Sequence, residues 1–385
     1  MRFLTKLVHG HGFFEEETGT SIPPIYQVAM FEQPDKRTGE TRLTDRGTEL
    51  KYSREENPTV RALERALSAI EDAEDSLAFS SGMSAISTLY VTLLKSGSRI
   101  IVPIEAYGTT IQLALDLSKF GVKAVKVWPS AEAFIEAIKP GDFVILETVT
   151  NPTLKVIDAR EVAKACKEAG ATLIVDNTFA SPVTYKPQID GASYTVESLT
   201  KYIGGHNDVV GGCVASTREK IVELWEWRRK LGTIMHPFEA FLVLRGIKTL
   251  GVRFERQSRT ALEIAEYLSD HPCVEEVLYP GLNSSPYKTL ADKLFLTKLY
   301  GGVVSFKVKG NRSKALKVLS KVKVIRASPS LGGTESLLTY PVISAARMIP
   351  EEERLKLGIT DSLLRLSVGL EDPEDLKEDL SNALI

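Results

Sequence analysis

The sequence predicts an α/β fold with a mostly parallel central sheet. Two continuous apolar runs, Phe143–Glu147 and Thr172–Asn177, have the length and composition of buried strands, and the stretch near Ala159–Ala169 between them has helical spacing. Strands that are buried on both faces and alternate with helices are typical of a parallel sheet covered by helices. With 385 residues, of which 43% are hydrophobic, the chain can bury a large core and form two or three domains.

Charge and hydropathy limit the partners that the chain can have. The net charge of -2 provides no basic surface for nucleic acid or for an anionic membrane, so small metabolites are the expected partners. No apolar run approaches the ~20 residues that span a bilayer, and the first residues lack the apolar core of a signal peptide. We therefore expect a soluble, cytoplasmic protein.

The cysteines and histidines predict neither disulfides nor a metal site. Cys166, Cys213 and Cys273 are odd in number, widely spaced and mostly set in apolar sequence, which is typical of buried thiols. His9 and His11 lie close together but have no partner Cys or carboxylate at ligand spacing.

The first 50 residues are predicted to be an N-terminal arm. They are rich in Gly, Thr, Pro and charge, and Ile22–Tyr26 must be extended because each proline restricts itself and its predecessor. Such an arm needs a surface to lie on, and a neighbouring subunit is a natural candidate.

The first strong helix follows the arm. Asn57 is a good N-cap, Pro58 suits the first turn, and apolar residues recur at three- and four-residue steps from residue 60 to residue 70. Tyr52 and Arg54 stand just before this helix. Local sequence supports a surface ion pair for Arg54 as well as it supports phosphate binding.

A second candidate anion contact lies at residues 81–83. The apolar run beginning at Leu77 breaks into small residues before a helical stretch, Ala85–Leu94. The backbone N–H groups of Ser81, Gly82 and Met83 would then point outward at a helix start, where anions bind.

Tyr107 falls in a loop between the predicted strand at 99–102 and a helix that begins near Ile111. Its ring could stack on a planar cofactor, or it could simply pack within the loop. No Gly-x-Gly-x-x-Gly or Gly-x(4)-Gly-Lys-Ser/Thr loop is present, so dinucleotide and nucleoside-triphosphate sites lose their main support.

Asp176 ends the second of the two apolar runs. A carboxylate at that position is costly to bury without a cation or hydrogen-bond donors. A protonated pyridine nitrogen would be such a cation, and Asn151 offers a polar loop at the same edge. The alternative is that Asp176 caps the next turn.

The stretch Ser198–His206 contains the most informative lysine. Lys201 follows an apolar run, Ala192–Val196, so it is expected at the carboxyl end of a strand, where open α/β sheets bind ligands. The hydroxyls of Ser198 and Thr200 suit phosphate oxygens. A lysine beside a phosphate site suggests an amine that bonds to pyridoxal phosphate, whereas a lone lysine is usually a solvated surface residue.

The carboxyl-terminal part, from about residue 246, begins with a long helical pattern near 253–268 and continues with short alternating strands and helices. Arg365 lies in a strand-like context where its charge requires a partner. A bidentate arginine suits a substrate α-carboxylate, and a structural ion pair is the alternative.

Taken together, the motifs resemble those of the pyridoxal-phosphate enzymes of cysteine and methionine metabolism. The motifs are Tyr-Ser-Arg-x-x-Asn-Pro-Thr at 52–59, Ser-Ser-Gly-Met at 80–83, Tyr-Gly-x-Thr at 107–110, Glu-x-x-x-Asn-Pro at 147–152, Val-Asp-Asn-Thr-Phe-Ala at 175–180 and Thr-Lys-Tyr-Ile-Gly-Gly-His at 200–206. The resemblance continues through 241–250, 279–282, 330–333 and 364–369 and covers nearly the whole chain.

The resemblance implies a fold-type I, aspartate-aminotransferase-like enzyme. Its parts would be an arm at 1–50, a pyridoxal-phosphate-binding domain at 51–245 and a smaller α+β domain at 246–385. Family members are usually tetramers whose minimum active unit is a dimer, because Tyr52 and Arg54 would bind the phosphate of the adjacent subunit.

The resemblance also implies the roles of individual residues. Lys201 would hold the cofactor and then move protons, for which its pKa must fall from about 10.4. Asp176 would keep the pyridine nitrogen protonated and Tyr107 would stack on the ring. The phosphate would be bound by Ser81, Gly82, Met83, Ser198 and Thr200, and the substrate carboxylate by Arg365, Ser330 and Asn151.

The expected reaction is γ-replacement or γ-elimination on a homoserine-derived amino acid, as in cystathionine γ-synthase or cystathionine γ-lyase. Cystathionine β-lyase, O-acylhomoserine sulfhydrylase and methionine γ-lyase are the alternatives within the family, and a non-catalytic cofactor-binding regulatory or scaffold protein is the alternative outside it. Two departures bear on specificity: Ser344-Ala345-Ala346 replaces the Met-Thr-His of many relatives, and Thr109 stands where methionine γ-lyases carry Cys.

Overall fold

The computed structural model describes residues 1–13 and 19–385, and its centre is a seven-stranded sheet in the order β1-β7-β6-β5-β4-β2-β3. The strands β2, β3, β4, β5 and β6 pair in parallel, while β7 runs antiparallel to both of its neighbours. The prediction of a mostly parallel sheet is therefore confirmed. The strands are β1 (Asp75–Phe79), β2 (Arg99–Pro103), β3 (Lys123–Val127), β4 (Phe143–Glu147), β5 (Thr172–Asp176), β6 (Tyr194–Ser198) and β7 (Gly212–Ser216).

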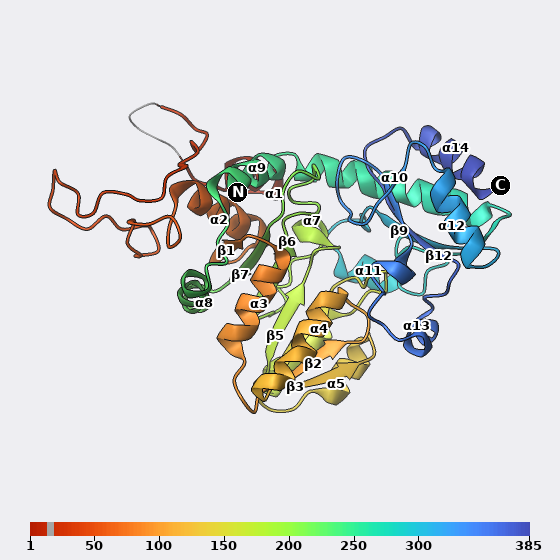
Figure 1. Cartoon of the computed structure of the whole chain (residues 1–385), viewed down its shortest axis with the longest axis horizontal. Helices are drawn as coiled ribbons and strands as arrows, with labels where there is room; N and C mark the ends of the chain where they lie inside the picture. The colour runs from red at the N-terminus through yellow and green to blue at the C-terminus, as the bar shows by residue number, and fades with distance from the viewer. Residues whose placement is uncertain (14–18) are drawn as a thin grey trace.

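Helices cover both faces of this sheet, so its central strands carry apolar residues on both sides (Figure 1). One face packs against α3 (Gly82–Leu93), α4 (Gly108–Asp116) and α8 (Arg218–Leu231). The other packs against α2 (Pro58–Glu71), α5 (Ala131–Ala137) and α6 (Ala159–Glu168). The turn η1 (Leu117–Phe120) and the short α7 (Ser181–Thr184) complete the connections. Because helices cover the faces of the sheet, a ligand can bind only at the carboxyl ends of the strands.

A smaller domain follows two linking helices, α9 (Pro237–Ile247) and the 21-residue α10 (Leu250–Asp270). Its five-stranded sheet has the order β10-β11-β12-β9-β8 and is antiparallel except for the β10–β11 pair. The strands are β8 (Val274–Leu278), β9 (Val303–Val308), β10 (Arg326–Ala327), β11 (Leu337–Thr339) and β12 (Leu363–Ser367). The remaining elements are α11 (Lys288–Leu294), α12 (Arg312–Lys321), η2 (Pro341–Ile343), α13 (Glu351–Leu357) and α14 (Pro373–Leu384).

The amino-terminal region is tied to its own chain at several points. The helix α1 (Phe3–His9) packs against α2 and α10. The extended segment at 22–26 docks on the start of α2, where Tyr26 N–H donates to Thr59 Oγ1 (2.9 Å) and Thr59 Oγ1 donates to Pro24 O (2.8 Å). The chain between these anchors and α2 forms long loops that project from the body (Figure 1). The boundaries of an arm at 1–50 stay a prediction.

A buried ion cluster fastens the last part of this region to the main domain. The Arg46 side chain is fully buried and contacts Glu56 (3.0 Å), Glu64 (3.0 Å) and Asp75 (2.9 Å). Arg228 from α8 also binds Glu64 (2.6 Å). Because each charge is paired, the cluster satisfies groups that would otherwise be costly to bury.

The local helix and strand signals were accurate within about three residues, and the largest differences lie at the starts of α3, α4 and α10. Asn57 caps α2 by accepting from Thr59 N–H (3.0 Å), as predicted. The strand expected at 192–196 is β6, shifted by two residues so that Ser198 is its last residue. Among the described residues no helix is long and apolar enough to cross a membrane, and no group of three potential ligands could hold a metal ion.

We predict that Arg46→Met destabilises the folded protein by about 3–5 kcal/mol, because it leaves three buried carboxylates without their shared cation. The measurement is the urea midpoint of unfolding. Arg37→Met is the matched control, since the Arg37 side chain is 81% exposed and its change should cost little. Equal midpoints for the two variants would contradict the role given to the cluster.

Candidate active site

A cavity of about 720 Å³ opens at the carboxyl ends of β4, β5 and β6 and at the start of α3. It lies where the main domain meets the loops of the smaller one. Eleven of the predicted site residues line it: Ser81, Gly82, Met83, Tyr107, Asn151, Asp176, Ser198, Thr200, Lys201, Ser330 and Arg365. The fold therefore brings together residues that are up to 284 positions apart in the sequence, from 81 to 365.

The turn that carries Lys201 is held by an arginine that the sequence did not identify. Buried Arg253 on α10 donates to the carbonyl oxygens of Tyr202 (2.8 Å), Ile203 (3.3 Å) and Gly246 (2.8 Å). Gly205 has φ +71°, and a Cβ there would lie 1.8 Å from Arg253 Nη1. Glycine is thus required for this approach, and the approach fixes the backbone just after the lysine.

The Lys201 side chain is partly buried, and its amine has a lowered pKa. Its Nζ donates to Ser330 Oγ (2.8 Å), and the structure gives it no carboxylate partner among the described residues. Burial, and secondarily the nearby Arg365 cation, lower its pKa to about 8. Both effects penalise the ammonium form, so a neutral amine becomes accessible near neutrality.

Asp176 ends β5 with hydrogen-bond donors but, within residues 1–13 and 19–385, without a cation. Its Oδ1 accepts from Thr178 N–H (3.1 Å) and Thr178 Oγ1 (2.6 Å), and Thr178 Oγ1 in turn accepts from Ser198 N–H (2.9 Å). Burial raises the pKa of Asp176, and the two bonds from Thr178 oppose that rise. A partly buried carboxylate of this kind fits a ligand that brings its own positive charge.

Glu147 is a cavity residue whose role the sequence did not reveal. It lies opposite Asp176 on neighbouring strands, and its Oε1 accepts from Tyr107 N–H (2.6 Å). Its Oε2 is buried without a partner, and burial together with Asp176 raises its pKa well above the usual range. A protonated Glu147 therefore positions the Tyr107 backbone without adding a second buried charge. The acid ending the run at 143–147 was the available signal.

The candidate phosphate contact is formed by the approach of β7 to the start of α3. Ser81 caps this 12-residue helix by accepting from Ser84 N–H (2.9 Å). A Cβ on Gly212 would lie 2.4 Å from Ser81 O and 2.7 Å from Gly82 N. The small residues leave the helix N-terminus open to an anion at the cavity wall.

Arg365 provides a buried cation in the same cavity. Its Nη1 donates to Asn151 Oδ1 (2.7 Å) and its Nη2 to Ser330 O (2.9 Å), while Nε is buried without a partner. Burial lowers its pKa to about 10. No carboxylate pairs with it among residues 1–13 and 19–385, so the structural ion pair considered from sequence is absent there. An incoming carboxylate would complete the set.

Tyr52 and Arg54 lie outside this cavity. Both are exposed, and the Arg54 guanidinium stands 5.3 Å from the centre of the Tyr52 ring. Arg54 also donates to Arg229 O, and its nearest carboxylate is Glu55 at 4.0 Å. Within one chain, therefore, neither residue contacts the candidate phosphate site.

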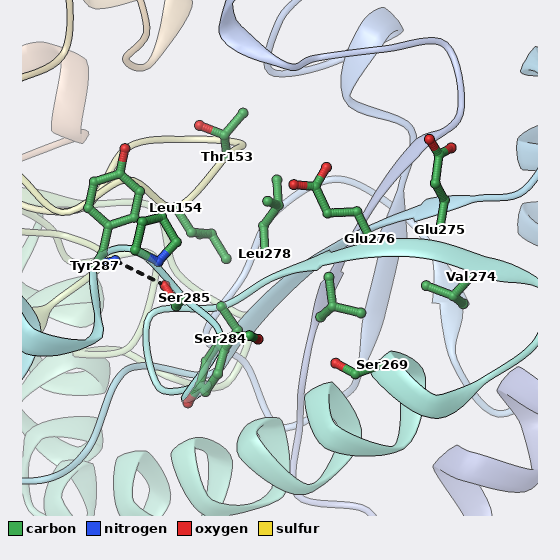
Figure 2. A pocket seen from close by; sticks show the side chains of 13 residues that line it. Thr153, Leu154, Ser269, Val274, Glu275, Glu276, Leu278, Ser284, Ser285 and Tyr287 are labelled. Atoms are coloured by element: carbon green, nitrogen blue, oxygen red, sulfur yellow. Dashed lines mark hydrogen bonds between the residues drawn. The ribbon is translucent and has the colours of Figure 1, made fainter.

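A second, smaller cavity of about 340 Å³ follows the edge strand β8 and contains none of the predicted site residues. Figure 2 shows Glu275 and Glu276 of β8 together with Thr153, Leu154 and Tyr287. It lacks an amine or a buried cation, so the chemistry belongs to the larger cavity.

The larger cavity fits pyridoxal phosphate on each count that its residues can test. It offers an amine of lowered pKa, a buried carboxylate without a cation, an open helix N-terminus for a phosphate and an exposed Tyr107 ring at its wall. An aldehyde, a protonated ring nitrogen, a phosphate and a flat ring are the groups that these four features bind.

Comparison with known proteins also indicates a pyridoxal-phosphate site. The profile of the family described as Cys/Met metabolism PLP-dependent enzyme matches residues 4–385. Cystathionine gamma-lyase of Bacillus subtilis (strain 168) is 39% identical over 100% of this chain and 99% of its own length. Cystathionine gamma-synthase 1, chloroplastic, of Arabidopsis thaliana is 39% identical over 88% of this chain and 61% of its own length.

Solved structures extend the likeness to the fold. The crystal structure of metB from Corynebacterium glutamicum has a TM-score of 0.92 at 38% identity and covers 100% of this chain and 98% of that chain. Further relatives at 35–37% identity are named cystathionine beta-lyase and L-methionine gamma-lyase. Their names differ in the reaction while their identities to this chain are nearly equal.

Proposed function

The chain belongs to the family of Cys/Met metabolism PLP-dependent enzymes, and from this membership we propose that it catalyses γ-replacement or γ-elimination on a homoserine-derived amino acid, as cystathionine γ-synthase or cystathionine γ-lyase does. Its cofactor is pyridoxal 5'-phosphate. The observation that carries the proposal is the partly buried Lys201 amine, which has a pKa of about 8 and shares one cavity with Arg365 and Asp176.

Named residues would hold the cofactor in this cavity. Lys201 would bond to it, Asp176 would pair with its ring nitrogen and Tyr107 would stack on its ring. The helix start at Ser81, Gly82 and Met83 and the hydroxyls of Ser198 and Thr200 would bind its phosphate. When bound, pyridoxal phosphate supplies an electron sink that stabilises negative charge next to the amino group of a substrate.

Lys201 would carry out the proton transfers. With a pKa of about 8, its neutral form would take a proton from the α-carbon of the substrate. Once that proton has been passed on, the amine is neutral again and would take a proton from the β-carbon. Loss of the β-proton allows the γ-substituent to leave. The hydrogen bond to Ser330 Oγ orients the amine and stabilises the loop that faces it.

Arg365, Asn151 and Ser330 would fix the substrate by its α-carboxylate. Asn151 and the Ser330 carbonyl already hold the two terminal nitrogens of Arg365, and this contact sets the plane of the guanidinium. A carboxylate bound there would present the α-carbon to Lys201, since all three side chains line one cavity.

The alternative activities within the family differ in the substrate and not in the residues that hold the cofactor. Thr109, Ser344 and Ala345 line the cavity, so the two departures noted in the sequence fall where selectivity between cystathionine, methionine and acylhomoserine would be decided. Cystathionine β-lyase, O-acylhomoserine sulfhydrylase and methionine γ-lyase activities are the rivals. A non-catalytic scaffold would have no need of a proton-transfer lysine.

We further propose that the active unit is a homodimer, assembled into a tetramer in the cytoplasm. Tyr52 and Arg54 are exposed and lie away from the cavity of their own chain, which suits a contact with the cofactor phosphate of an adjacent subunit. The projecting loops between residue 26 and α2 would reach that neighbour (Figure 1).

The reaction itself is tested by identifying products. We expect the cofactor-loaded protein, mixed with an O-acylhomoserine and cysteine, to form cystathionine or to release 2-oxobutanoate and ammonia, as detected by mass spectrometry. Cystathionine would assign a synthase, and 2-oxobutanoate alone would assign elimination. Pyruvate from cystathionine, with no γ-product from any ester, would contradict the proposal in favour of β-lyase activity.

The role of Lys201 is tested by Lys201→Ala. We expect turnover to fall about 10²-fold or more, the usual contribution of a positioned acid–base group, together with loss of the visible absorption band of the attached cofactor. Circular dichroism should show an unchanged fold. Retention of full activity by a folded variant would rule out the catalytic assignment.

A further inference from the structure

The mouth of the larger cavity carries a charged side chain that the roles above leave unused. Arg347 lines the cavity and is exposed to solvent. Its backbone N–H donates to Ser344 O (3.3 Å). Within the described ranges 1–13 and 19–385, its guanidinium forms no hydrogen bond or ion pair, although every other charged residue of the lining has a polar partner.

The backbone around Arg347 is well anchored. The turn follows η2, which continues from β11, where Thr339 pairs with Arg365. Ala346 is fully buried beside Ile349 in a small apolar cluster of the smaller domain. These contacts fix the turn on both sides of Arg347, so the guanidinium projects from a defined position.

The same turn packs against the start of α4. A Cβ on Gly108 would lie 3.6 Å from Ala345 O and 3.7 Å from Met348 Cβ. Gly108 follows Tyr107, the residue expected to stack on the cofactor ring. Arg347 therefore belongs to an exposed turn that borders the cavity beside the start of α4, in the same cavity as Arg365.

Its neighbours on the turn offer little to a neutral polar group. Ser344 Oγ donates to Tyr340 O (2.9 Å) and lies 3.1 Å from Thr339 Oγ1, so its hydroxyl is used within the turn. Ala345 has no polar side-chain atom. Among the side chains of residues 344–347, the guanidinium of Arg347 is therefore the group suited to bind a ligand, because its planar donors match a carboxylate or a phosphate.

We propose that Arg347 is a specificity-determining residue that binds an anion at the far end of the substrate's γ-substituent. The substrate class is then an amino acid with two anions, an α-carboxylate for Arg365 and a distal carboxylate or phosphate for Arg347. This inference rests on the proposed function, because it takes the α-carboxylate to be bound at Arg365.

The test compares substrates that differ in the charge of that end. The assembled holoenzyme is assayed with cysteine and O-succinylhomoserine, O-phosphohomoserine or O-acetylhomoserine, and without cysteine on cystathionine or methionine. The succinyl ester, the phosphate ester and cystathionine carry a distal anion, while the acetyl ester and methionine do not. Whichever anionic compound reacts best identifies the source of the anion.

We expect Arg347→Met to lower kcat/KM for the preferred anionic substrate about tenfold, mainly through KM. The kcat/KM for O-acetylhomoserine and for methionine should not change. Arg347→Lys should restore part of the loss, and added salt should weaken the preference of the unmodified enzyme. Arg326→Met is the matched control, since Arg326 is an exposed arginine outside the cavity.

The outcomes separate this inference from the proposed function. If the unmodified enzyme acts at the γ-carbon but Arg347→Met lowers kcat/KM equally for charged and neutral compounds, the role of Arg347 is wrong and the proposed function stands. A preference of the unmodified enzyme for the neutral compounds would also overturn it. If none of the five compounds reacts at the γ-carbon, the proposed function fails, and the inference fails with it.

Discussion

The site depends on lowering the pKa of one amine in a protein whose carboxylates could instead raise it. Lys201 is partly buried and lies near the Arg365 cation, and among the described residues its amine donates only to the hydroxyl of Ser330. A carboxylate placed beside it would raise its pKa again and convert it to an ordinary lysine. The surrounding acids are accordingly directed elsewhere: Asp176 accepts from Thr178, and Glu147 accepts from the Tyr107 backbone. The fold must therefore keep the Lys201 amine apart from the carboxylates of Asp176 and Glu147.

The scaffold supplies this separation through strand order. Because β4, β5 and β6 are parallel neighbours, Glu147, Asp176 and Ser198 end at the same edge of the sheet. The antiparallel β7 then brings Gly212 against the start of α3, and the smaller domain adds Ser330 and Arg365 from the other side. Arg253 ties the Lys201 turn to α10, the helix that links both domains. The chemistry thus requires the two domains to meet, although each has its own sheet.

The sequence predicted the place of a site residue where a local pattern of apolar residues determines the strand or helix beside it. Asp176, Lys201 and Ser81 follow apolar runs, so their places at strand ends or helix starts were evident from sequence. The roles of Arg253 and Thr178 were not, because each depends on a partner brought near only by folding. Glu147 ended a recognised strand, yet the rise of its pKa comes from burial and then from Asp176 beside it, both of which arise only on folding. Tyr52 and Arg54 show the limit in another way, since their expected partner belongs to another chain.

The pH dependence of cofactor attachment tests the central claim most directly. Only the neutral amine of Lys201 can bond to the cofactor's aldehyde, and the folded protein lowers its pKa from 10.5 to about 8. The rate at which the cofactor-free protein gains the visible absorption band should therefore rise as pH increases through about 8 and level off above it. A midpoint near 10.5, the value of an ordinary lysine, would contradict the account.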